Sequence, residues 1–546
     1  ARMNSISGDS LTGGRVAALF LLLRIASFLL FPLLGREGLT DPDESAYAES
    51  VREMAERGDW LVPHLYGEPF LDKPILFYWV MGASFRILGE NELAARLPSA
   101  LAAIVLLFAV WRLGKLVHKS DVAGLLSALV LTASLEFVLM GRAAVTDMLL
   151  TTFCTLAILC YVETLWGPGS RLLPLCGAAC LGLAVLTKGP VGLLIPGMVL
   201  GSCFAASRDW RRLRDVRPVA STLVFLAVAL PWYAAIEMNR PDLVEGFFLT
   251  ENLGRFLKAE HRAVSPFYYC VVLLLGFLPW SAFLPGAIGR GLSAWWRKDA
   301  SQSRLLLPIL WLLTLMVFFT LAASKLPSYI LPALPAAAIL AAEPLTAWLK
   351  PTPAGQRLPG TGAMLLLVIL AGGMVYFSMN RQSFGSIPAS FKTALLPVCF
   401  AGMLGTLFAL SALIMQRAKL AYLILQGGSV AIIFSLLLFG FPLLEPWKSS
   451  REAADAVRPM LQSADRLILY HESHAGFGFY LHRIPELVRS EPALEALLGE
   501  PGRVFCLMGR GNYEKLRARR PELPLYLLKS MGNAVVLTNR SPGRSP

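Results

Sequence analysis

The composition of the 546-residue chain identifies a membrane protein. Hydrophobic residues make up 55% of the sequence and charged residues only 16%, and the mean hydropathy is +0.57, whereas soluble domains carry about 25% charged residues. These values exclude a water-soluble globular protein. The net charge of +13 does not indicate nucleic-acid binding, because no RNA- or DNA-binding motif accompanies it and basic residues between apolar spans are typical of cytoplasmic loops.

Apolar runs separated by charged, Pro-rich or Gly-rich interruptions predict about thirteen transmembrane helices. No small-residue cleavage site follows the first run, so we expect a retained helix and not a removable signal peptide. An odd number of spans places the two chain ends on opposite sides, and the basic loops predict a cytoplasmic N-terminus. The predicted spans are residues 16–34, 93–113, 122–140, 146–163, 172–187, 190–206, 218–236, 266–287, 305–323, 328–348, 362–379, 391–415 and 420–441.

The loops on the opposite face hold nearly every unusual polar residue. The longest are 35–92 and 237–265, followed by the short loop 380–390. Within the first of them, the stretch 74–88 is apolar but too short and too interrupted to span, which suits a helix lying in the membrane interface. We therefore expect residues 1–445 to form one transmembrane catalytic domain whose site opens toward this face.

The composition becomes that of a soluble domain from Glu445 onward. Short apolar runs alternate with the helical patterns 451–462 and 513–519, and this alternation predicts a small α/β domain at residues 446–546. The apolar runs, which we expect to be strands, are 466–470, 503–508 and 534–537.

Two acidic helix starts lie on the same predicted face. Asp41, Pro42 and Glu44 have the spacing of a capping box that begins a helix outside the membrane, and Asp43 then shares a face with Tyr47. Asp147 begins another predicted helix. Each carboxylate has a simpler explanation as a cap or as a complement to the helix dipole, but their shared side of the membrane favours a common site.

A set of cations lies on that face as well. Lys73, Arg255 and Lys325 each stand beside an apolar segment, and Tyr329 follows Lys325 by four residues. Each cation taken singly could place its charge at the interface and its aliphatic stem in the lipid. Together they predict an anion site, in which arginine binds a phosphate bidentately and lysine supplies a point charge.

Phosphate-binding cations beside carboxylates indicate group transfer from a lipid-linked phosphate. The cations would stabilise the charge that develops on the departing phosphate. The carboxylates could act as a base, orient the acceptor, or bind a positive sugar substituent or a metal ion. A hydroxyl acceptor needs a base whereas an ionised phosphate acceptor does not, so these residues alone leave the role of Asp43 open.

Six motifs in the same order resemble those of bacterial aminoarabinose transferases, which belong with the protein O-mannosyltransferases among the GT-C type glycosyltransferases. The resemblance covers about residues 15–335 in motif detail. The motifs are Asp41–Ala48, Asp72–Ile75, Arg142–Asp147, Leu186–Pro190, Glu251–Phe256 and Ser324–Pro332.

This resemblance implies the transfer of 4-amino-4-deoxy-L-arabinose from undecaprenyl phosphate to a phosphate of lipid A, at the periplasmic face of a bacterial inner membrane, with resistance to polymyxin as the consequence. Such a protein is expected to act as a monomer with its C-terminal domain in the periplasm. By resemblance, the carrier phosphate would be bound by Lys73, Arg255, Lys325 and Tyr329, the sugar or acceptor would face Asp43 and Asp147, and Glu44, Tyr47 and Tyr78 would line the cavity.

Metal binding has weak support. Related enzymes use a metal in places, and His64, Asp72 and His261 are possible ligands for a divalent ion such as zinc, but their spacing matches no recognised site. Two other functions stay open: transfer of a sugar to protein Ser or Thr or to another envelope glycan, and a lipid-carrier flippase without chemistry. The absence of internal inverted repeats disfavours the flippase, because transporters bind their substrates between such repeats.

Overall fold

The computed structural model describes residues 5–167, 170–257, 265–299, 303–349, 367, 372, 389–471 and 474–541. Within these ranges, the side chains of residues 5–15, 250–253, 255, 303, 389–392 and 394 are not described. The predicted span 362–379 therefore lies outside the described residues except at two positions, as does nearly all of the predicted loop 380–390.

The chain divides into two compact units that are each assembled from separate segments. Unit 1 comprises Ala1–Pro32, Asp72–Leu76 and Ser99–Gly440, and unit 2 comprises Leu33–Leu71, Phe77–Pro98 and Phe441–Pro546. The first long loop thus groups with the C-terminal residues, apart from a short segment that belongs to unit 1.

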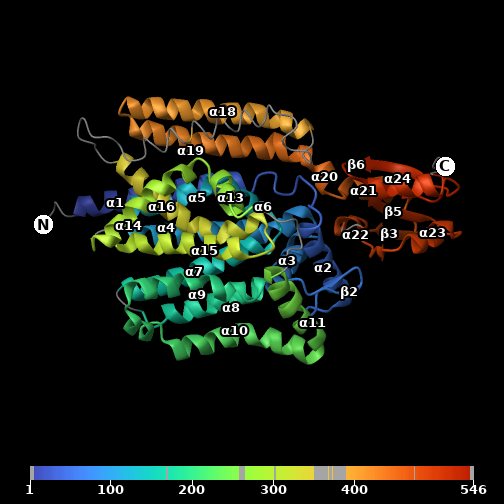
Figure 1. Ribbon diagram of the computed structural model, residues 1–546, viewed down its shortest axis with the longest axis horizontal. Helices are drawn as coiled ribbons and strands as arrows, with labels where there is room; N and C mark the ends of the chain where they lie inside the picture. Colours follow the sequence, from blue (N-terminus) through green and yellow to red (C-terminus); the bar gives the residue numbers. More distant parts are fainter. Residues whose placement is uncertain are drawn as a thin grey trace. The chain divides into compact units, whose positions relative to one another are not determined.

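Unit 1 is built from apolar helices, many of which lie side by side in Figure 1. Every predicted span other than 362–379 contains a helix. The helices are α1 (Ser5–Leu30), α4 (Glu92–His118, which begins in unit 2), α5 (Asp121–Thr132), α6 (Leu135–Arg142), α7 (Thr146–Trp166), α8 (Leu173–Lys188), α9 (Val191–Ser207), α10 (Pro218–Asn239), α11 (Pro241–Gly246), the π-helix η2 (Phe247–Gly254), α12 (Arg255–Leu257), α13 (Tyr268–Gly276), α14 (Leu284–Trp296), α15 (Leu306–Leu321), the 3₁₀ helix η5 (Pro327–Ala333), α16 (Leu334–Leu349), α18 (Ala389–Ile414) and α19 (Ala418–Ser435).

The count of thirteen continuous spans is not confirmed. Among the described residues, six helices are long and apolar enough to cross a membrane, or eight if each of two bent pairs is one span. The pair α5 and α6 is bent by 66°, and the chain from Tyr268 to Trp296 is bent by 113°. Several other apolar helices have only 16 or 17 residues. The chain is a multi-pass membrane protein.

The break between α5 and α6 has a local cause. The Ser134 hydroxyl donates to the carbonyl of Val130 at 2.8 Å, a bond that bends helices because it competes with the backbone ladder. The indole N–H of Trp280 donates to the carbonyl of Ala133 at 3.3 Å. A buried side chain thus satisfies a backbone group that the break exposes, as lipid surroundings require. The break gives α6 its own direction within unit 1.

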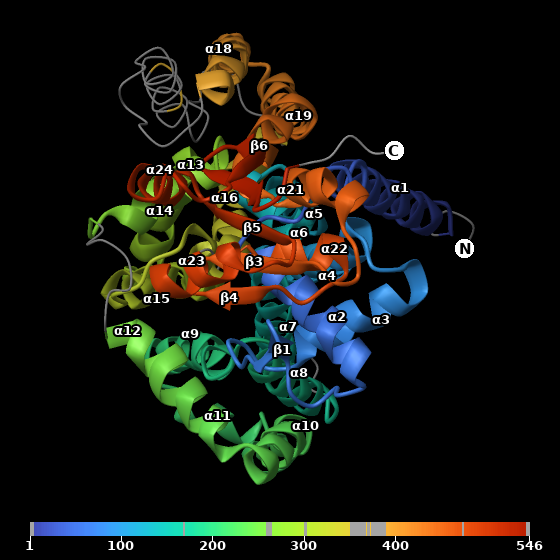
Figure 2. The same ribbon diagram turned by 90° about the vertical axis from the view of Figure 1, so that its right-hand side faces the viewer.

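Unit 2 contains a five-stranded sheet covered by helices, as Figure 2 shows. The strand order is β4-β3-β5-β7-β6; β3 is parallel to β4 and β5, whereas β7 is antiparallel to β5 and β6. The three predicted strands are confirmed, and β4 and β6 are additional. The strands are β3 (Arg466–Tyr470), β4 (Glu486–Val488), β5 (Val504–Gly509), β6 (Tyr526–Met531) and β7 (Ala534–Thr538).

One face of this sheet forms an apolar core with two helices. Ile468, Cys506 and Leu537 point from the strands toward Leu494 of α23 (Glu491–Gly499) and Leu516 of α24 (Arg510–Arg519), and all five are buried. The remaining elements of unit 2 are α2 (Asp43–Arg57), β1 (His64–Leu65), β2 (Glu68–Pro69), α3 (Leu76–Leu88, which begins in unit 1), the 3₁₀ helix η7 (Phe441–Leu444), α20 (Glu445–Lys448), α21 (Arg451–Val457), the 3₁₀ helix η8 (Arg458–Met460) and α22 (Ala475–Leu481).

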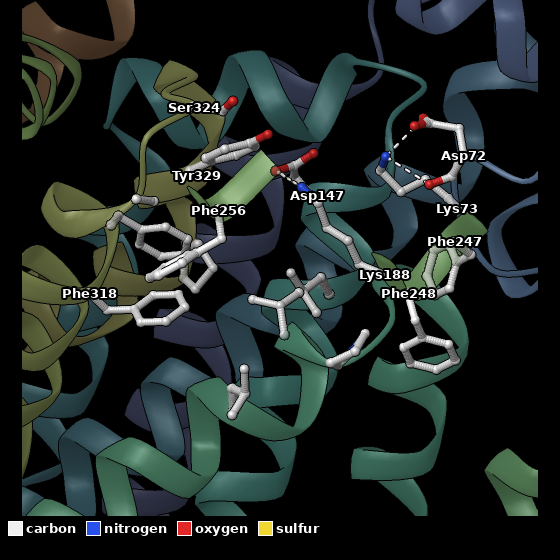
Figure 3. Close-up of a pocket in the computed structure, with 17 residues that line it drawn as sticks. Asp72, Lys73, Asp147, Lys188, Phe247, Phe248, Phe256, Phe318, Ser324 and Tyr329 are labelled. Carbon is white, nitrogen blue, oxygen red and sulfur yellow. Dashed lines mark hydrogen bonds and ion pairs between the residues drawn. The ribbon is translucent and has the colours of Figure 1, made fainter. Parts of the chain in front are cut away.

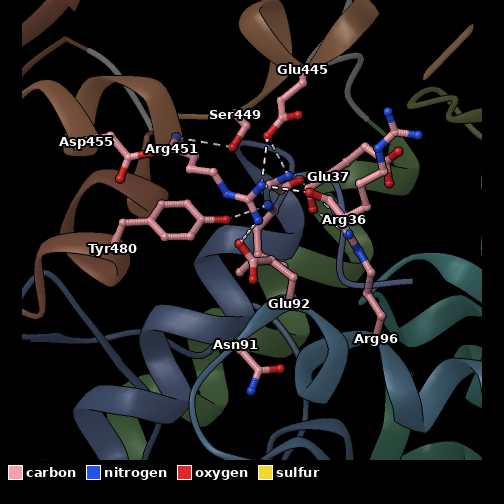
Figure 4. Close-up of polar contacts among 12 residues, drawn as sticks. Arg36, Glu37, Asn91, Glu92, Arg96, Glu445, Ser449, Arg451, Asp455 and Tyr480 are labelled. Atoms are coloured by element: carbon pink, nitrogen blue, oxygen red, sulfur yellow. Dashed lines mark hydrogen bonds and ion pairs between the residues drawn. The ribbon is translucent and has the colours of Figure 1, made fainter. Parts of the chain in front are cut away.

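Two arginines join the segments of unit 2 (Figure 4). Arg96 donates to both carboxylate oxygens of Glu44, at 2.9 and 2.7 Å, and to the carbonyls of Leu34, Glu37 and Gly38. Arg451 pairs with Glu92 and Glu445 and donates to the carbonyl of Arg36 at 2.7 Å. These bonds fix residues 34–38, which precede α2.

The predicted cap of the helix that follows is wrong. Pro42 stands at the N-cap of α2 without a side-chain cap bond, and Glu44 instead accepts from the backbone N–H of Thr40 at 2.9 Å. The Asp41 carboxylate accepts from the Ser45 and Ser450 hydroxyls and from the N–H of Gly476 at 3.1 Å. Asp41 therefore ties two segments of unit 2 together, Leu33–Leu71 and Phe441–Pro546, because its oxygens serve long-range partners as well as its own helix.

Candidate functional site

Unit 1 contains a cavity of about 430 Å³ that is polar at one end and apolar along its walls (Figure 3). Its lining comes from the segment 72–73 and from helices that are distant in sequence. The lining residues are Asp72, Lys73, Asp147, Leu150, Lys188, Pro190, Val191, Leu194, Phe247, Phe248, Phe256, Phe318, Phe319, Ala322, Ser324, Tyr329 and Pro332.

An ion pair between two helix ends forms the centre of the polar end. The Lys188 Nζ donates to Asp147 Oδ1 at 2.7 Å, and both side chains are about nine-tenths buried. Asp147 lies in the first turn of α7 and Lys188 is the last residue of α8, positions where the helix dipoles favour an anion and a cation respectively. The Lys188 Nζ also lies 4.9 Å from the centroid of the Tyr329 ring, a cation–π contact.

Tight packing of α8 against α9 fixes the position of Lys188. Gly189 ends α8 with φ +76°, a conformation that glycine adopts without strain. A Cβ atom at Gly192 would lie 2.4 Å from the carbonyl carbon of Ala184, so only glycine fits at this crossing. The chain therefore reverses directly after Lys188, which holds the ammonium at the cavity.

A second ion pair lies at the same end of the cavity. Lys73 Nζ is 2.8 Å from Asp72 Oδ2 and 3.1 Å from the carbonyl of Asp72, and both side chains are mostly buried. Figure 3 shows this pair across the cavity from Tyr329, with Asp147 and Lys188 between them. Two lysines therefore face one polar space, each with a carboxylate beside it.

Aromatic side chains form much of the apolar wall. Phe256 stacks on Phe318 with ring centroids 5.5 Å apart, and Phe319 lies 5.9 Å from Tyr329. Phe247 and Phe248 face them from η2 (Figure 3). A space with two lysines at one end and aromatic walls matches an amphiphile that has an anionic head and a hydrocarbon chain.

The structure brings together part of the predicted site. Lys73, Tyr329 and Asp147 all line the cavity, together with Asp72. Lys325 has a different environment, because its Nζ donates to the carbonyls of Phe319, Thr320 and Ala322 at the end of α15. The side chain of Arg255 and the whole of His261 lie outside the described residues.

Four other predicted residues belong to unit 2. Asp43 is the exposed first residue of α2. Glu44 is buried and paired with Arg96. Tyr47 and Tyr78 are buried with their ring centroids 5.6 Å apart. The approach of these residues to the cavity of unit 1 stays a prediction.

Lys188 is the charged lining residue that the sequence analysis did not assign to the site. It stands in one of the recognised motifs, Leu186–Pro190, but no sequence spacing connects it with Asp147, which is 41 positions away. A lysine at the end of an apolar helix, directly before Gly-Pro, was the available signal. The motif indicated that Lys188 lies near the site. Its pairing with Asp147 could not be predicted, because it depends on the packing of α8 against α7.

The predicted metal ligands do not form a group among the described residues. No three His, Cys, Asp or Glu side chains gather there at metal-binding distance. His64 Nδ1 lies 2.9 Å from the carbonyl oxygen of Val62, and Asp72 pairs with Lys73. Metal binding by His64, Asp72 and His261 stays an untested prediction.

Comparisons with known proteins place this architecture beside lipid-linked sugar transferases. Residues 72–234 match the family described as dolichyl-phosphate-mannose-protein mannosyltransferase. Two relatives are named undecaprenyl phosphate-alpha-4-amino-4-deoxy-L-arabinose arabinosyl transferase. That of Photorhabdus laumondii is 31% identical over 337 residues, which cover 60% of this chain and 59% of the relative. That of Yersinia enterocolitica is 33% identical over 336 residues, covering 61% and 59%.

The crystal structure of ArnT from Cupriavidus metallidurans bound to undecaprenyl phosphate has the same fold. It superposes with a TM-score of 0.80 at 23% identity, covering 97% of this chain and 99% of that chain. The aligned region of the chain spans about three fifths of the length of the curated relatives it matches. The predicted architecture is confirmed in its main features: a helical GT-C type membrane protein with a small C-terminal sheet region.

Proposed function

We propose that the protein is a glycosyltransferase that moves 4-amino-4-deoxy-L-arabinose from undecaprenyl phosphate to a phosphate of lipid A in the bacterial inner membrane. The observation that carries the proposal is the cavity of unit 1, where two lysines meet an aromatic wall. Its shape and charge suit a prenyl phosphate, and the names of the relatives supply the sugar.

In this proposal the polar end of the cavity binds the carrier phosphate. Lys73 and Lys188 supply positive charge, and Tyr329 supplies a hydroxyl. Arg255 is expected to join them by resemblance. As the bond to the sugar breaks, negative charge grows on the departing phosphate, and preorganised cations stabilise that charge most strongly in a site of low dielectric. The aromatic wall would receive the first isoprene units of the chain.

The reaction needs no oxidant and no cofactor to balance. A phosphate oxygen of lipid A attacks the anomeric carbon of the sugar and forms a new C–O bond. The C–O bond to the carrier breaks, and undecaprenyl phosphate departs with the electron pair. An ionised phosphate acceptor has no proton to lose, so Asp43 and Asp147 serve best as partners of the amino sugar or as orienting groups, since general base catalysis is needed only for a protonated acceptor.

The direct test uses purified protein in lipid nanodiscs with the aminoarabinose-linked carrier and lipid A. We expect free undecaprenyl phosphate and modified lipid A to appear in equal amounts. Lys73→Met should weaken binding of the carrier, and Asp43→Asn should abolish transfer while the protein stays folded, because it removes charge and keeps volume. Unchanged lipid A in cells that express the protein under inducing conditions would contradict the proposal.

A second function is favoured by the matched family, whose description names protein mannosylation. Transfer of a sugar to protein Ser or Thr would use the same carrier site but would need a base for the hydroxyl acceptor. Glycosylated envelope protein together with unmodified lipid A would identify that function. A flippase would move the carrier across liposomes without releasing free undecaprenyl phosphate.

The orientation is part of the proposal. With a cytoplasmic N-terminus, the cavity and residues 446–546 lie on the periplasmic side, where lipid A and the flipped donor are available. Resistance to polymyxin follows from such an activity, because the added ammonium group reduces the negative charge of lipid A. Labelling of single cysteines near Asp72 and in β6 from the periplasm tests this arrangement.

A further inference from the structure

A buried carboxylate stands behind the polar end of the cavity and has no part in binding the carrier phosphate. Glu136 lies in the first turn of α6 and is only 7% exposed. Its Oε1 atom has no hydrogen-bond partner among the described residues. A buried carboxylate oxygen without a partner is costly, so the few that persist in proteins call for an explanation.

The charged group that faces Glu136 has the same sign. Asp147 interacts with it electrostatically, and Tyr268 of α13 lies close enough to sense its charge. The ion pairs of the described residues include none with Glu136, whereas Asp147 has Lys188. With the Asp72–Lys73 pair included, this end of unit 1 holds three carboxylates and two lysine ammonium groups, so it has one carboxylate more than its cations can pair.

A second buried polar group lies on the same wall. The Tyr269 side chain is fully buried, and the backbone N–H of Leu326 lies beside its hydroxyl. Its ring lies 6.0 Å from Phe319 of the cavity wall, and Tyr329 and Asp147 interact with its hydroxyl electrostatically. The helices α6 and α13 also pack against each other and against η5, which carries Tyr329.

The packing leaves no space on the other side of Glu136. A Cβ atom at Gly276 would lie 3.0 Å from the Glu136 Cβ and 3.5 Å from its Oε2. The backbone of α13 thus closes one side of the carboxylate, and the charged group that interacts with it is Asp147, which lines the cavity. In a site from which water is excluded, such a charge acts over several ångströms with little screening.

We propose that Glu136, placed behind Asp147, makes this end of the cavity selective for a donor sugar that carries a positively charged amino group. The inference rests on the proposed function and adds the residue that makes binding of the sugar depend on its charge. Glu136 is a positioning residue in this scheme: Asp147 meets the ammonium, and Glu136 supplies the second negative charge that offsets Lys188.

The test compares two donors with the same sugar and the same carrier but different charge: the aminoarabinose carrier, which is an ammonium, and its N-formyl derivative, which is a neutral amide. We expect the wild-type protein to prefer the amine in kcat/KM. Glu136→Gln should lower kcat/KM for the amine about tenfold and leave that for the neutral donor unchanged. Glu136→Asp should retain most of the preference, because it keeps the charge.

Two controls separate recognition from folding. Tyr269→Phe removes the neighbouring buried hydroxyl without changing charge and should leave the preference for the amine in place. Glu136→Gln should not lower the melting temperature, because it removes a buried charge that has no partner. A structural role would instead lower the melting temperature and reduce transfer from both donors equally.

The outcomes distinguish this inference from the proposed function. Equal loss for both donors in Glu136→Gln, or an unchanged preference, overturns the role of Glu136 while the activity of the wild-type protein stands. A wild-type protein that releases undecaprenyl phosphate from neither donor overturns the proposed function itself. A loss of kcat/KM in Glu136→Gln that is confined to the amine donor supports both the role of Glu136 and the proposed function.

Discussion

The cavity of unit 1 and the arginine network of unit 2 use the same residue types for opposite purposes. Arg96 directs all of its donor groups at protein acceptors. Lys188 donates a hydrogen bond to a single carboxylate oxygen, and the rest of its ammonium faces a cavity. A buried cation whose donors are all used by the protein holds the fold, whereas one with remaining donors at a cavity is available to a ligand.

The largest expected effect concerns the unit 2 network. Arg96→Met should lower the free energy of unfolding by about 3–5 kcal/mol, because it leaves the Glu44 carboxylate buried without its partner. Thermal unfolding in detergent measures this effect. The double variant Arg96→Met with Glu44→Leu should recover much of the stability. A single variant as stable as the wild type would mean that the network does not hold residues 34–38.

Lys188→Met tests the other side of the comparison. Transfer should fall by about 10²–10³-fold, the loss expected when one preorganised electrostatic group is removed, with a smaller effect on stability. The release of undecaprenyl phosphate in nanodiscs measures it. The double variant with Asp147→Asn controls for the unpaired carboxylate. Activity above one tenth of the wild-type value would remove Lys188 from the phosphate site.

The pH dependence of unit 2 provides an intermediate effect. Burial raises the pKa of Glu49 in α2 to about 7, despite its hydrogen bonds with Arg52. Because the folded state binds this proton more tightly than the unfolded state, the contribution of Glu49 to stability is greatest below about pH 4.5 and is lost as the pH rises through about 7. The decline is up to about 3 kcal/mol. Melting temperatures of the wild type and Glu49→Gln across this range check it: the variant should show the smaller decline.

Lys325 should give the smallest effect. Its ammonium binds the last carbonyls of α15, so Lys325→Met should cost about 0.3–1 kcal/mol of stability through the lost interaction with the helix end. We expect transfer to change less than threefold. A loss of carrier affinity comparable to that of Lys73→Met would return Lys325 to the phosphate site. It would also weaken the rule that a buried cation binds a ligand only when some of its donors are not used by the protein.

The sequence was sufficient for the main features of the architecture and for part of the site. Apolar runs located the helices, because a span needs an uninterrupted length of apolar residues, and the motifs located Lys73, Asp147 and Tyr329. Periodicity does not report breaks inside a span: the bend at Ala133 depends on the indole of Trp280, which is 147 residues away.

The residues that the sequence missed depend on long-range partners. The role of Lys188 depends on its ion pair with Asp147, which is 41 residues away. The interaction of Glu136 with Asp147 depends on the direction that the break gives to α6. Asp41 looked like a helix cap because its local spacing fits one, yet Ser450 and Gly476 compete for its oxygens. Local sequence rules cannot rank such distant partners.

The discontinuous build of unit 2 has a consequence for biosynthesis. Arg96 and Glu44 emerge from the ribosome early, but Arg451, which closes on Glu92 and the carbonyl of Arg36, follows more than 340 residues later. At about 5–20 residues per second this interval lasts on the order of tens of seconds. During that time the early segments must stay soluble without their partners, so a nascent chain halted before residue 441 should depend on chaperones.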